Sequence, residues 1–240
     1  MNLLAFDTST ELMSVAVQRR LDDTRATTLA SPLWQHSGPG GAQTSTHLIP
    51  TIQRLLEQAG LQLSDLDAIA FGQGPGSFTG LRTACSVAQG LALGANLKVL
   101  PIDTLLAVAE EARYQQANAI STWQVAALLD ARMGEIYAAC YAFDQGQWRQ
   151  VRDHRLARPQ DLGDVAGYAV AGNVFAQYGA QLPPETVRID AWPTATALLR
   201  LAPALLAAGG AVAADQAMPL YIRDKVAQTT LERLAEKAAR

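Results

Sequence analysis

The chain has 240 residues, of which 49% are hydrophobic and 17% charged, and its formal net charge is -3 at pH 7. This length and composition predict a globular protein of one large or two small domains and exclude a disordered chain. The slightly acidic balance argues against a protein whose own surface is dominated by nucleic-acid binding.

The first elements in chain order are strands. Residues 3–6 are fully apolar and predict a short strand, and residues 13–18 alternate as its hairpin partner. Residues 27–31 fit a third strand. Residues 31–45 are rich in Gly, Pro and Ser and predict a loop. The apolar periodicity that follows predicts a helix over about 46–59.

The next segment alternates between strands and helices. We expect a strand over residues 67–71, a helix over about 79–95 and a strand over 98–102. Asp103 suits the N-cap of a further helix that runs to about residue 116. This alternation is typical of α/β proteins with parallel strands.

The loop "GQGPGSFTGLR", residues 72–82, is glycine-rich and lies between a strand and a helix. It lacks the lysine of a P-loop, and its glycines do not follow the G-x-G-x-x-G spacing. A helix N-terminus can still attract an anion, so a phosphate site stays open beside the favoured interpretation, a tight turn. If Gly76 has a positive φ, a Gly76→Val substitution should destabilise the fold.

A weak internal repeat links the two halves of the chain. "LLAFDTSTELMSVAV" and "AALLDARMGEIYAAC" each contain an apolar run that ends in an aspartate, Asp7 or Asp130. Each also has a glutamate in the turn, Glu11 or Glu135, and an alternating strand after it. The repeat predicts a duplicated unit of a β-hairpin followed by α and β elements.

This duplicated pattern resembles the plan of the actin-like ATPase (ASKHA) superfamily, in which two lobes usually clamp ATP. We therefore expect an α/β protein with two actin-like lobes, residues 1–104 and 105–224, and a helical tail at 225–240. A helix over about 194–207 is also expected. Asp7 fits the first phosphate-binding hairpin of that plan, and an ordinary Asx-turn explains it equally well.

The turn "DARMGE" carries two carboxylates that could do acid–base chemistry, Asp130 and Glu135. Arg132 lies between them and could pair with either, and Gly134 supplies the bend. Because paired charges in a turn more often fix its structure than catalyse, we favour a structural role.

Signals for disulfides, metals and membranes are weak. Cys85 and Cys140 show no C-x-x-C pattern, and the N-terminus lacks the features of a signal peptide. No apolar run approaches the roughly 18–20 residues that span a bilayer. We expect a cytoplasmic protein without membrane contact.

Five strings together closely resemble the TsaB (YeaZ) family of bacterial tRNA threonylcarbamoyladenosine biosynthesis proteins. The resemblance runs over nearly the whole chain and is strongest over about residues 1–105 and 128–141. "GPGSFTGLR" is the most specific string. The others are "LLAFDTST", "AQGLALG", "DARMGEIYAACY" and "PLYIRD".

The resemblance implies a two-lobed actin-like fold and a supporting role. Members of the family are paralogues of TsaD, the subunit that transfers a threonylcarbamoyl group to N6 of adenosine 37 in tRNAs reading ANN codons. They are regarded as non-catalytic subunits that dimerise with TsaD. The implied partners are a TsaD-like catalytic paralogue, a TsaE-like ATPase, and tRNA mainly through the complex. An exposed apolar stripe could also make the chain a homodimer when it is alone.

Catalysts of the TsaD type carry an H-x-x-x-H metal pair, and the corresponding positions here are Thr104 and Val108. Neither is a useful metal ligand. The three histidines, His36, His47 and His154, include no such pair and suit structural or exposed roles. We expect no catalytic residue, no metal and no cofactor. The alternative is a small ATP-dependent kinase or ATPase of the same superfamily that uses Asp7.

The helices over 46–59 and 79–95 carry apolar stripes that could either pack wholly inside their own lobe or stay exposed and mark an interaction site. The resemblance implies pairing with TsaD through helices of the first lobe, so we expect the stripe to stay exposed as the partner surface. Small side chains at spacings of three and four let another helix approach closely. The residues that we assign to this surface are Ile49, Ile52, Leu56, Leu81, Ala84, Ala88, Leu91 and Ala95.

Overall fold

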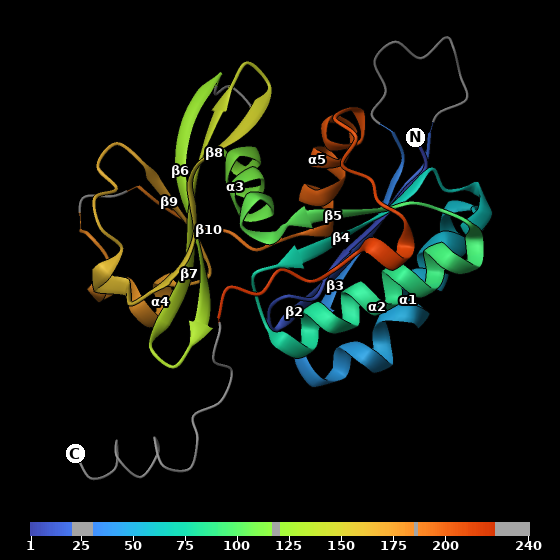
Figure 1. Cartoon of the computed structure of the whole chain (residues 1–240), viewed down its shortest axis with the longest axis horizontal. Coiled ribbons are helices and arrows are strands. Elements are labelled where there is room, and N and C mark those ends of the chain that lie inside the picture. The colour runs from blue at the N-terminus through green and yellow to red at the C-terminus, as the bar shows by residue number, and fades with distance from the viewer. Residues whose placement is uncertain (21–30, 117–120, 185–186, 224–240) are drawn as a thin grey trace.

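The protein is described by a computed structural model that covers residues 1–20, 31–116, 121–184 and 187–223. Two five-stranded sheets stand side by side, with helices between them and on their outer faces (Figure 1). The first sheet has the order β3-β2-β1-β4-β5. Its strands are β1 (Leu3–Asp7), β2 (Leu12–Gln18), β3 (Leu33–Pro39), β4 (Ala68–Gly74) and β5 (Val99–Asp103).

The second sheet repeats the connectivity of the first. In each sheet the first strand pairs antiparallel with the second and parallel with the fourth. The expected duplication is therefore confirmed. The order is β10-β9-β6-β7-β8, with strands β6 (Thr122–Arg132), β7 (Glu135–Asp144), β8 (Gln147–Ala157), β9 (Ala169–Gly172) and β10 (Arg188–Asp190).

The helices lie close to the expected ranges, and Asp103 caps its helix by accepting a hydrogen bond from the Leu105 amide. None of the helices in the described ranges has the length and apolarity to cross a membrane. The helices are α1 (Thr44–Ala59), α2 (Phe78–Ala95), α3 (Thr104–Gln115), α4 (Phe175–Tyr178) and α5 (Ala195–Ala207). Short 3₁₀ turns occur at Gly41–Gln43, Leu63–Asp65, Pro159–Asp161, Gly179–Gln181 and Ala214–Gln216.

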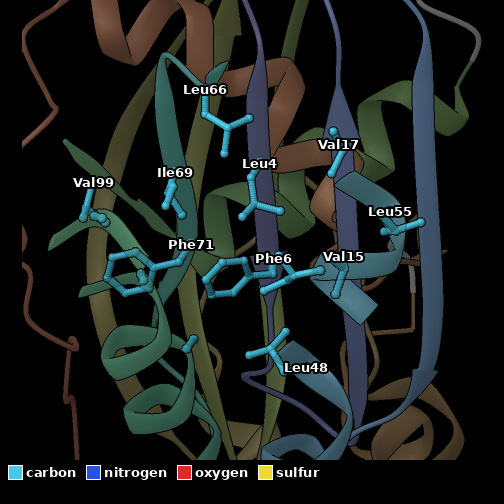
Figure 2. Packing of buried hydrophobic residues seen from close by; sticks show 14 of the residues in the cluster. Leu4, Phe6, Val15, Val17, Leu48, Leu55, Leu66, Ile69, Phe71 and Val99 are labelled. Carbon is cyan, nitrogen blue, oxygen red and sulfur yellow. The ribbon is translucent and has the colours of Figure 1, made fainter. Parts of the chain in front are cut away.

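The core of the first lobe follows from strand alternation. Large side chains of β1, β2 and β4 project to the face that α1 and α2 cover (Figure 2). Small side chains such as Ala5, Ala16 and Ala70 face the other way and pack against α5. Because successive side chains of a strand alternate between faces, one strand serves both layers.

Helix α5 returns from the second half of the chain to the first sheet. It packs against β1 and β2, and Val212 beyond it pairs with Val99. The lobe boundaries at residues 104 and 224 remain a prediction. They would assign α5 to the second lobe, although α5 packs on the first sheet. We call the first sheet with α1, α2 and α5 the first lobe, and the second sheet with α3 and α4 the second lobe.

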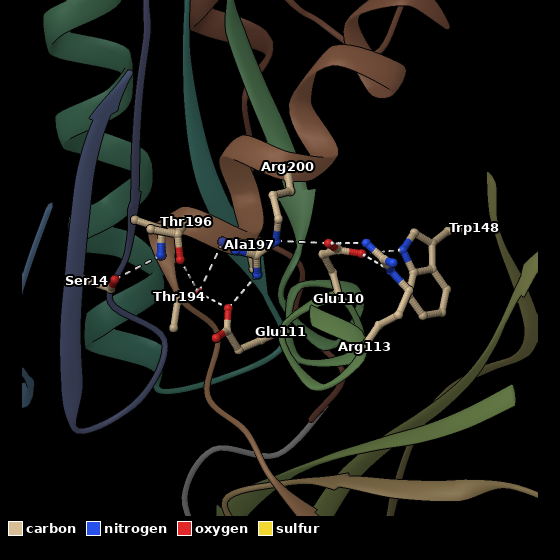
Figure 3. A network of polar contacts seen from close by, with 10 residues as sticks. Ser14, Glu110, Glu111, Arg113, Trp148, Thr194, Thr196, Ala197 and Arg200 are labelled. Carbon is tan, nitrogen blue, oxygen red and sulfur yellow. Dashed lines mark hydrogen bonds and ion pairs between the residues drawn. The ribbon is translucent and has the colours of Figure 1, made fainter. Parts of the chain in front are cut away.

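A partly buried polar network, centred on the buried Glu110, joins α3, α5 and β8 (Figure 3). The Glu110 carboxylate accepts hydrogen bonds from Arg113, Arg200 and the Trp148 indole at 2.9–3.0 Å. Arg200 also binds Glu111 at 2.6 Å. Because α5 packs on the first sheet and β8 belongs to the second, the network ties the two lobes together.

The predicted secondary structure was wrong in one place and incomplete in two. Residues 33–39, expected as a loop, form β3, because pairing with β2 in continuous register outweighs their Gly and Pro content. Pro39 is the last residue of this edge strand, where the missing backbone N–H does not remove a hydrogen bond between strands. Strands β8 and β10 were not expected. Residues 27–30 of the expected third strand and the expected tail helix lie outside the described residues.

Candidate functional site

The glycine-rich loop packs directly on the turn between β1 and β2. The Ser77 amide donates to the Ser9 carbonyl at 2.7 Å, and the Thr8 hydroxyl donates to the Gly80 carbonyl at 2.7 Å. A Cβ atom at Gly76 would lie 2.5 Å from the Ser9 carbonyl oxygen. The glycine is therefore required by close approach, and Gly76 is not among the positive-φ residues.

Asp7 lies beneath this contact and is fully buried. Its carboxylate accepts hydrogen bonds from the Ser9 amide at 2.8 Å, the Ser9 hydroxyl at 2.6 Å and Thr104 at 3.4 Å. Burial raises the pKa of Asp7 from 3.8 to about 6, and the hydrogen bonds from Ser9 and Thr104 oppose that rise. The side chain thus forms an Asx-turn that is sealed from solvent.

The raised pKa gives a pH-dependent prediction for Asp7→Asn. The folded state holds a proton that the unfolded chain releases, so Asp7 lowers stability as pH rises from about 4 to about 6. Asparagine carries no charge and keeps the oxygen that Ser9 binds. The unfolding free energy of the variant minus that of the unmodified chain should rise by about 2 kcal/mol when the pH is raised from 4.5 to 7.5. Urea unfolding at both pH values measures this, and an unchanged difference refutes it. The exposed Asp215→Asn variant is the control.

The second hairpin turn, between β6 and β7, faces the first across a cleft. Arg132, Met133 and Gly134 have φ values of 63°, 57° and 75°, which close the turn. Asp130 accepts hydrogen bonds from the Arg132 amide at 2.8 Å and the Tyr178 hydroxyl at 3.0 Å. Its carboxylate also pairs with the Arg132 guanidinium at 3.0 Å. These contacts hold the turn in place and agree with the favoured structural role.

The two lobes meet across this cleft of about 330 Å³. Arg132 reaches Glu11 of the first hairpin at 3.3 Å, and both side chains are largely exposed, so the pair is weak. Arg223 binds Glu135 at 2.8 Å and the Ala131 carbonyl at 3.0 Å. An exposed ion pair, Arg132–Glu11, therefore spans the cleft, and the volume of the cleft is at the lower end for ligand pockets.

Residues 217–223 form a strap from the first lobe to the second. The Leu220 amide donates to the Gln73 carbonyl at 2.8 Å, and Tyr221 stacks on Phe78 with ring centroids 5.4 Å apart. Arg82 donates to the Tyr221 hydroxyl at 3.1 Å. Sequence reasoning quoted "PLYIRD" only for its resemblance and did not foresee this contact, which joins segments about 140 residues apart in sequence.

The histidines show no metal-binding arrangement. His36 lies on β3, and His47 is exposed near the start of α1. His154 lies 3.0 Å from the Asp103 carboxylate, which also accepts from the Tyr141 hydroxyl. Burial lowers the pKa of His154, but Asp103 outweighs it, so the pKa lies above its usual value. No group of three or more His, Cys, Asp or Glu suited to a metal occurs in the ranges that the structure covers.

The resemblance placed Thr104 and Val108 at the expected metal positions of TsaD-type proteins, and both residues lie inside the fold. Thr104 accepts a hydrogen bond from the Gly74 amide at 3.0 Å, and Val108 packs in the core of the second lobe. Both side chains are fully buried. They therefore act in packing and in anchoring the glycine-rich loop.

The expected partner stripe is mostly inside its own lobe. Five of its residues are buried in the cores, because α1 and α2 pack their apolar faces on the first sheet: Ile52, Leu56, Leu81, Ala84 and Ala88. The expectation that these side chains stay exposed was wrong. Ile49 is 41% exposed, and Leu91 and Ala95 are half-buried. The use of α1 and α2 as a partner surface remains a prediction.

Comparisons with known proteins show consistent similarity. The family model described as "TsaD: tRNA N6-adenosine threonylcarbamoyltransferase" matches residues 36–166. The tRNA threonylcarbamoyladenosine biosynthesis protein TsaB of Haemophilus influenzae is 34% identical over 94% of this chain and 95% of its own length. The Escherichia coli protein of the same name is 32% identical, over 95% and 96%.

A solved structure shows the same similarity. The chain superposes on YeaZ from Pseudomonas aeruginosa with a TM-score of 0.78 and 38% sequence identity. The match covers 92% of this chain and 99% of the other. Together with the family match and the two repeated sheets, it confirms the two-lobed actin-like fold.

Proposed function

The chain belongs to the TsaB family, and from that premise we propose that it is a non-catalytic subunit of a tRNA-modifying complex. It binds and supports a TsaD-like catalytic paralogue that forms N6-threonylcarbamoyladenosine at position 37 of tRNAs reading ANN codons. The relatives that carry the name of this pathway support the assignment.

The observation that carries the non-catalytic role is the chemical type and the burial of Thr104 and Val108, the two residues at the expected metal positions. Thr104 and Val108 offer no imidazole, and both are enclosed in the fold. A substrate could not reach Val108 without unpacking α3 from the second sheet, and Thr104 is enclosed by its contacts with Asp7 and Gly74. The chain therefore acts in the complex by binding.

The alternative is an ATP-dependent kinase or ATPase that uses Asp7 and the glycine-rich loop. Asp7 is sealed beneath the Ser9 turn, and the Ser77 amide at the start of α2 is already bonded to Ser9. Both groups are thus occupied within the fold. Titration with ATP and Mg²⁺ separates the two functions, since tight binding with turnover by the isolated chain would favour the kinase.

We place the partner surface on the outward side of α2, and this replaces the buried stripe. Leu93 projects from this side with 79% of its surface exposed. A shallow groove lies between α2 and the Leu63–Asp65 turn, and its lining residues are Gln62, Leu63, Ser64, Gly90, Leu91, Gly94 and Ala95. The absence of side chains at the glycines lets a partner helix approach closely, and Leu93 supplies apolar area.

Leu93→Arg should abolish pairing with the catalytic paralogue and leave thermal stability within about 0.5 kcal/mol, since the side chain is exposed. Co-purification and melting curves measure the two effects. Val187→Arg, also at an exposed position but on the second lobe, should pair normally. Ala88→Arg should unfold the chain, because it buries a charge. Normal pairing by Leu93→Arg would place the interface elsewhere.

The remaining partners follow from the same role. A TsaE-like ATPase joins the complex, and tRNA contacts the chain mainly within it. When the paralogue is absent, the same face of α2 serves a second copy of the chain. Leu93→Arg should then shift the isolated protein toward the monomer in size-exclusion chromatography.

A further inference from the structure

Strand β8 carries three arginines and one aspartate in a chain whose net charge is -3. Its register with β7 sets Arg149 opposite Ala142, Arg152 opposite Cys140 and Arg155 opposite Ala138. Register shifts in this ladder bring arginines three residues apart onto one face of the sheet.

The face can be identified from the core residues opposite. Ala138 and Cys140 belong to the cluster on the side of the sheet with α4, whereas Tyr137 and Tyr141 belong to the cluster that packs on α3. The three arginines thus lie on the face away from α3 and the first lobe. This face is the outer side of the second lobe, with β8 at its edge (Figure 1). We call it the arginine row.

Among the described residues, no ion pair neutralises the charge of the arginine row. None of its guanidinium groups has a carboxylate of a described residue within 4.0 Å. Arg152 and Arg155 donate to the backbone carbonyls of Asp164 and Leu162, which fixes the side chains but leaves their charge. Burial raises the pKa of Cys140, and the positive charges of Arg152 and Arg155 oppose that rise.

We propose that the arginine row is a docking surface for the phosphodiester backbone of RNA. Guanidinium groups bind phosphate oxygens through paired N–H donors and do so without reading sequence. The row extends for about 20 Å along the strand, enough to meet several phosphates. The inference rests on the proposed function, which brings a tRNA to the complex and favours RNA over an acidic protein.

Arg149→Gln provides the test, because this exposed side chain has no hydrogen-bonding partner among the described residues and its loss leaves the fold intact. Lys98→Gln is the matched control, since it removes one exposed positive charge from the first lobe. Binding of fluorescent tRNA is measured from 50 to 300 mM KCl for the isolated full chain and for its assembly with the catalytic paralogue. Arg149→Gln should weaken binding about 3- to 10-fold at low salt and lower the salt slope by about 1.

Lys98→Gln should leave both quantities unchanged. Equal tRNA affinities and equal salt slopes for the two variants would overturn the proposal. Competition with tRNA for the chain by polyglutamate, added at the same concentration of negative charge, would also overturn it. Assembly with the paralogue is recorded separately by size-exclusion chromatography. If no complex forms, the proposed function fails, and the comparison on the isolated chain still decides the arginine row.

Discussion

Replacing Gly80 by alanine is expected to destabilise the protein by about 3 kcal/mol or more. An added Cβ atom would lie 1.9 Å from the Thr8 carbonyl oxygen, which is backbone and cannot move aside. The Thr8 hydroxyl also binds the Gly80 carbonyl, so any displacement breaks that hydrogen bond. Urea unfolding monitored by circular dichroism measures the change.

Gly90→Ala in the same helix is the matched control. A Cβ atom there meets nothing within 4 Å, and alanine is the better helix former. This variant should therefore be more stable by up to about 1 kcal/mol. If both substitutions have the same effect, the close packing of α2 on the β1–β2 turn is not what requires Gly80.

Replacing Glu110 by alanine is expected to cost about 3–5 kcal/mol, because it leaves Arg113 and the Trp148 indole N–H without their acceptor and removes one of the two carboxylates that Arg200 binds. Glu110 is 2% exposed and binds Arg113, Arg200 and Trp148. The loss should also loosen the lobes, since these residues come from α3, α5 and β8. The change is measured by the midpoint of urea unfolding and by the exchange of amide hydrogens in β8.

Glu57→Ala is the control, because Glu57 lies on the exposed side of α1. It should change stability by no more than about 0.5 kcal/mol. A Glu110→Ala variant as stable as Glu57→Ala would mean that the network is not required to hold the lobes together.

The duplicated fold was predictable because it is encoded locally. Apolar strands that end in an aspartate occur twice, and pairing and alternation follow from them. The edge strands were not predictable in the same way. Residues 33–39 and 147–157 are polar or glycine-rich, and they become strands because a neighbouring strand offers a partner.

The candidate site was only partly predictable. The turn chemistry of Asp7 and Asp130 follows from short sequence patterns. The small residues of α2 were assigned to a partner because such residues suit close approach by any neighbour. In this protein the neighbour of α2 is the first sheet. Only the burial of the side chains distinguishes packing on the chain's own sheet from packing on a partner. Contacts of the strap at Arg223 depend on the whole fold, and no local pattern predicts them.

The central claim, that this chain supports catalysis without performing it, is tested most directly by the formation of N6-threonylcarbamoyladenosine from threonylcarbamoyl-adenylate and tRNA. The chain alone should form none, because Thr104 and Val108 are buried and neither side chain is a useful metal ligand. The chain together with the catalytic paralogue should form more than the paralogue alone. Modified adenosine formed by the isolated chain would contradict the account.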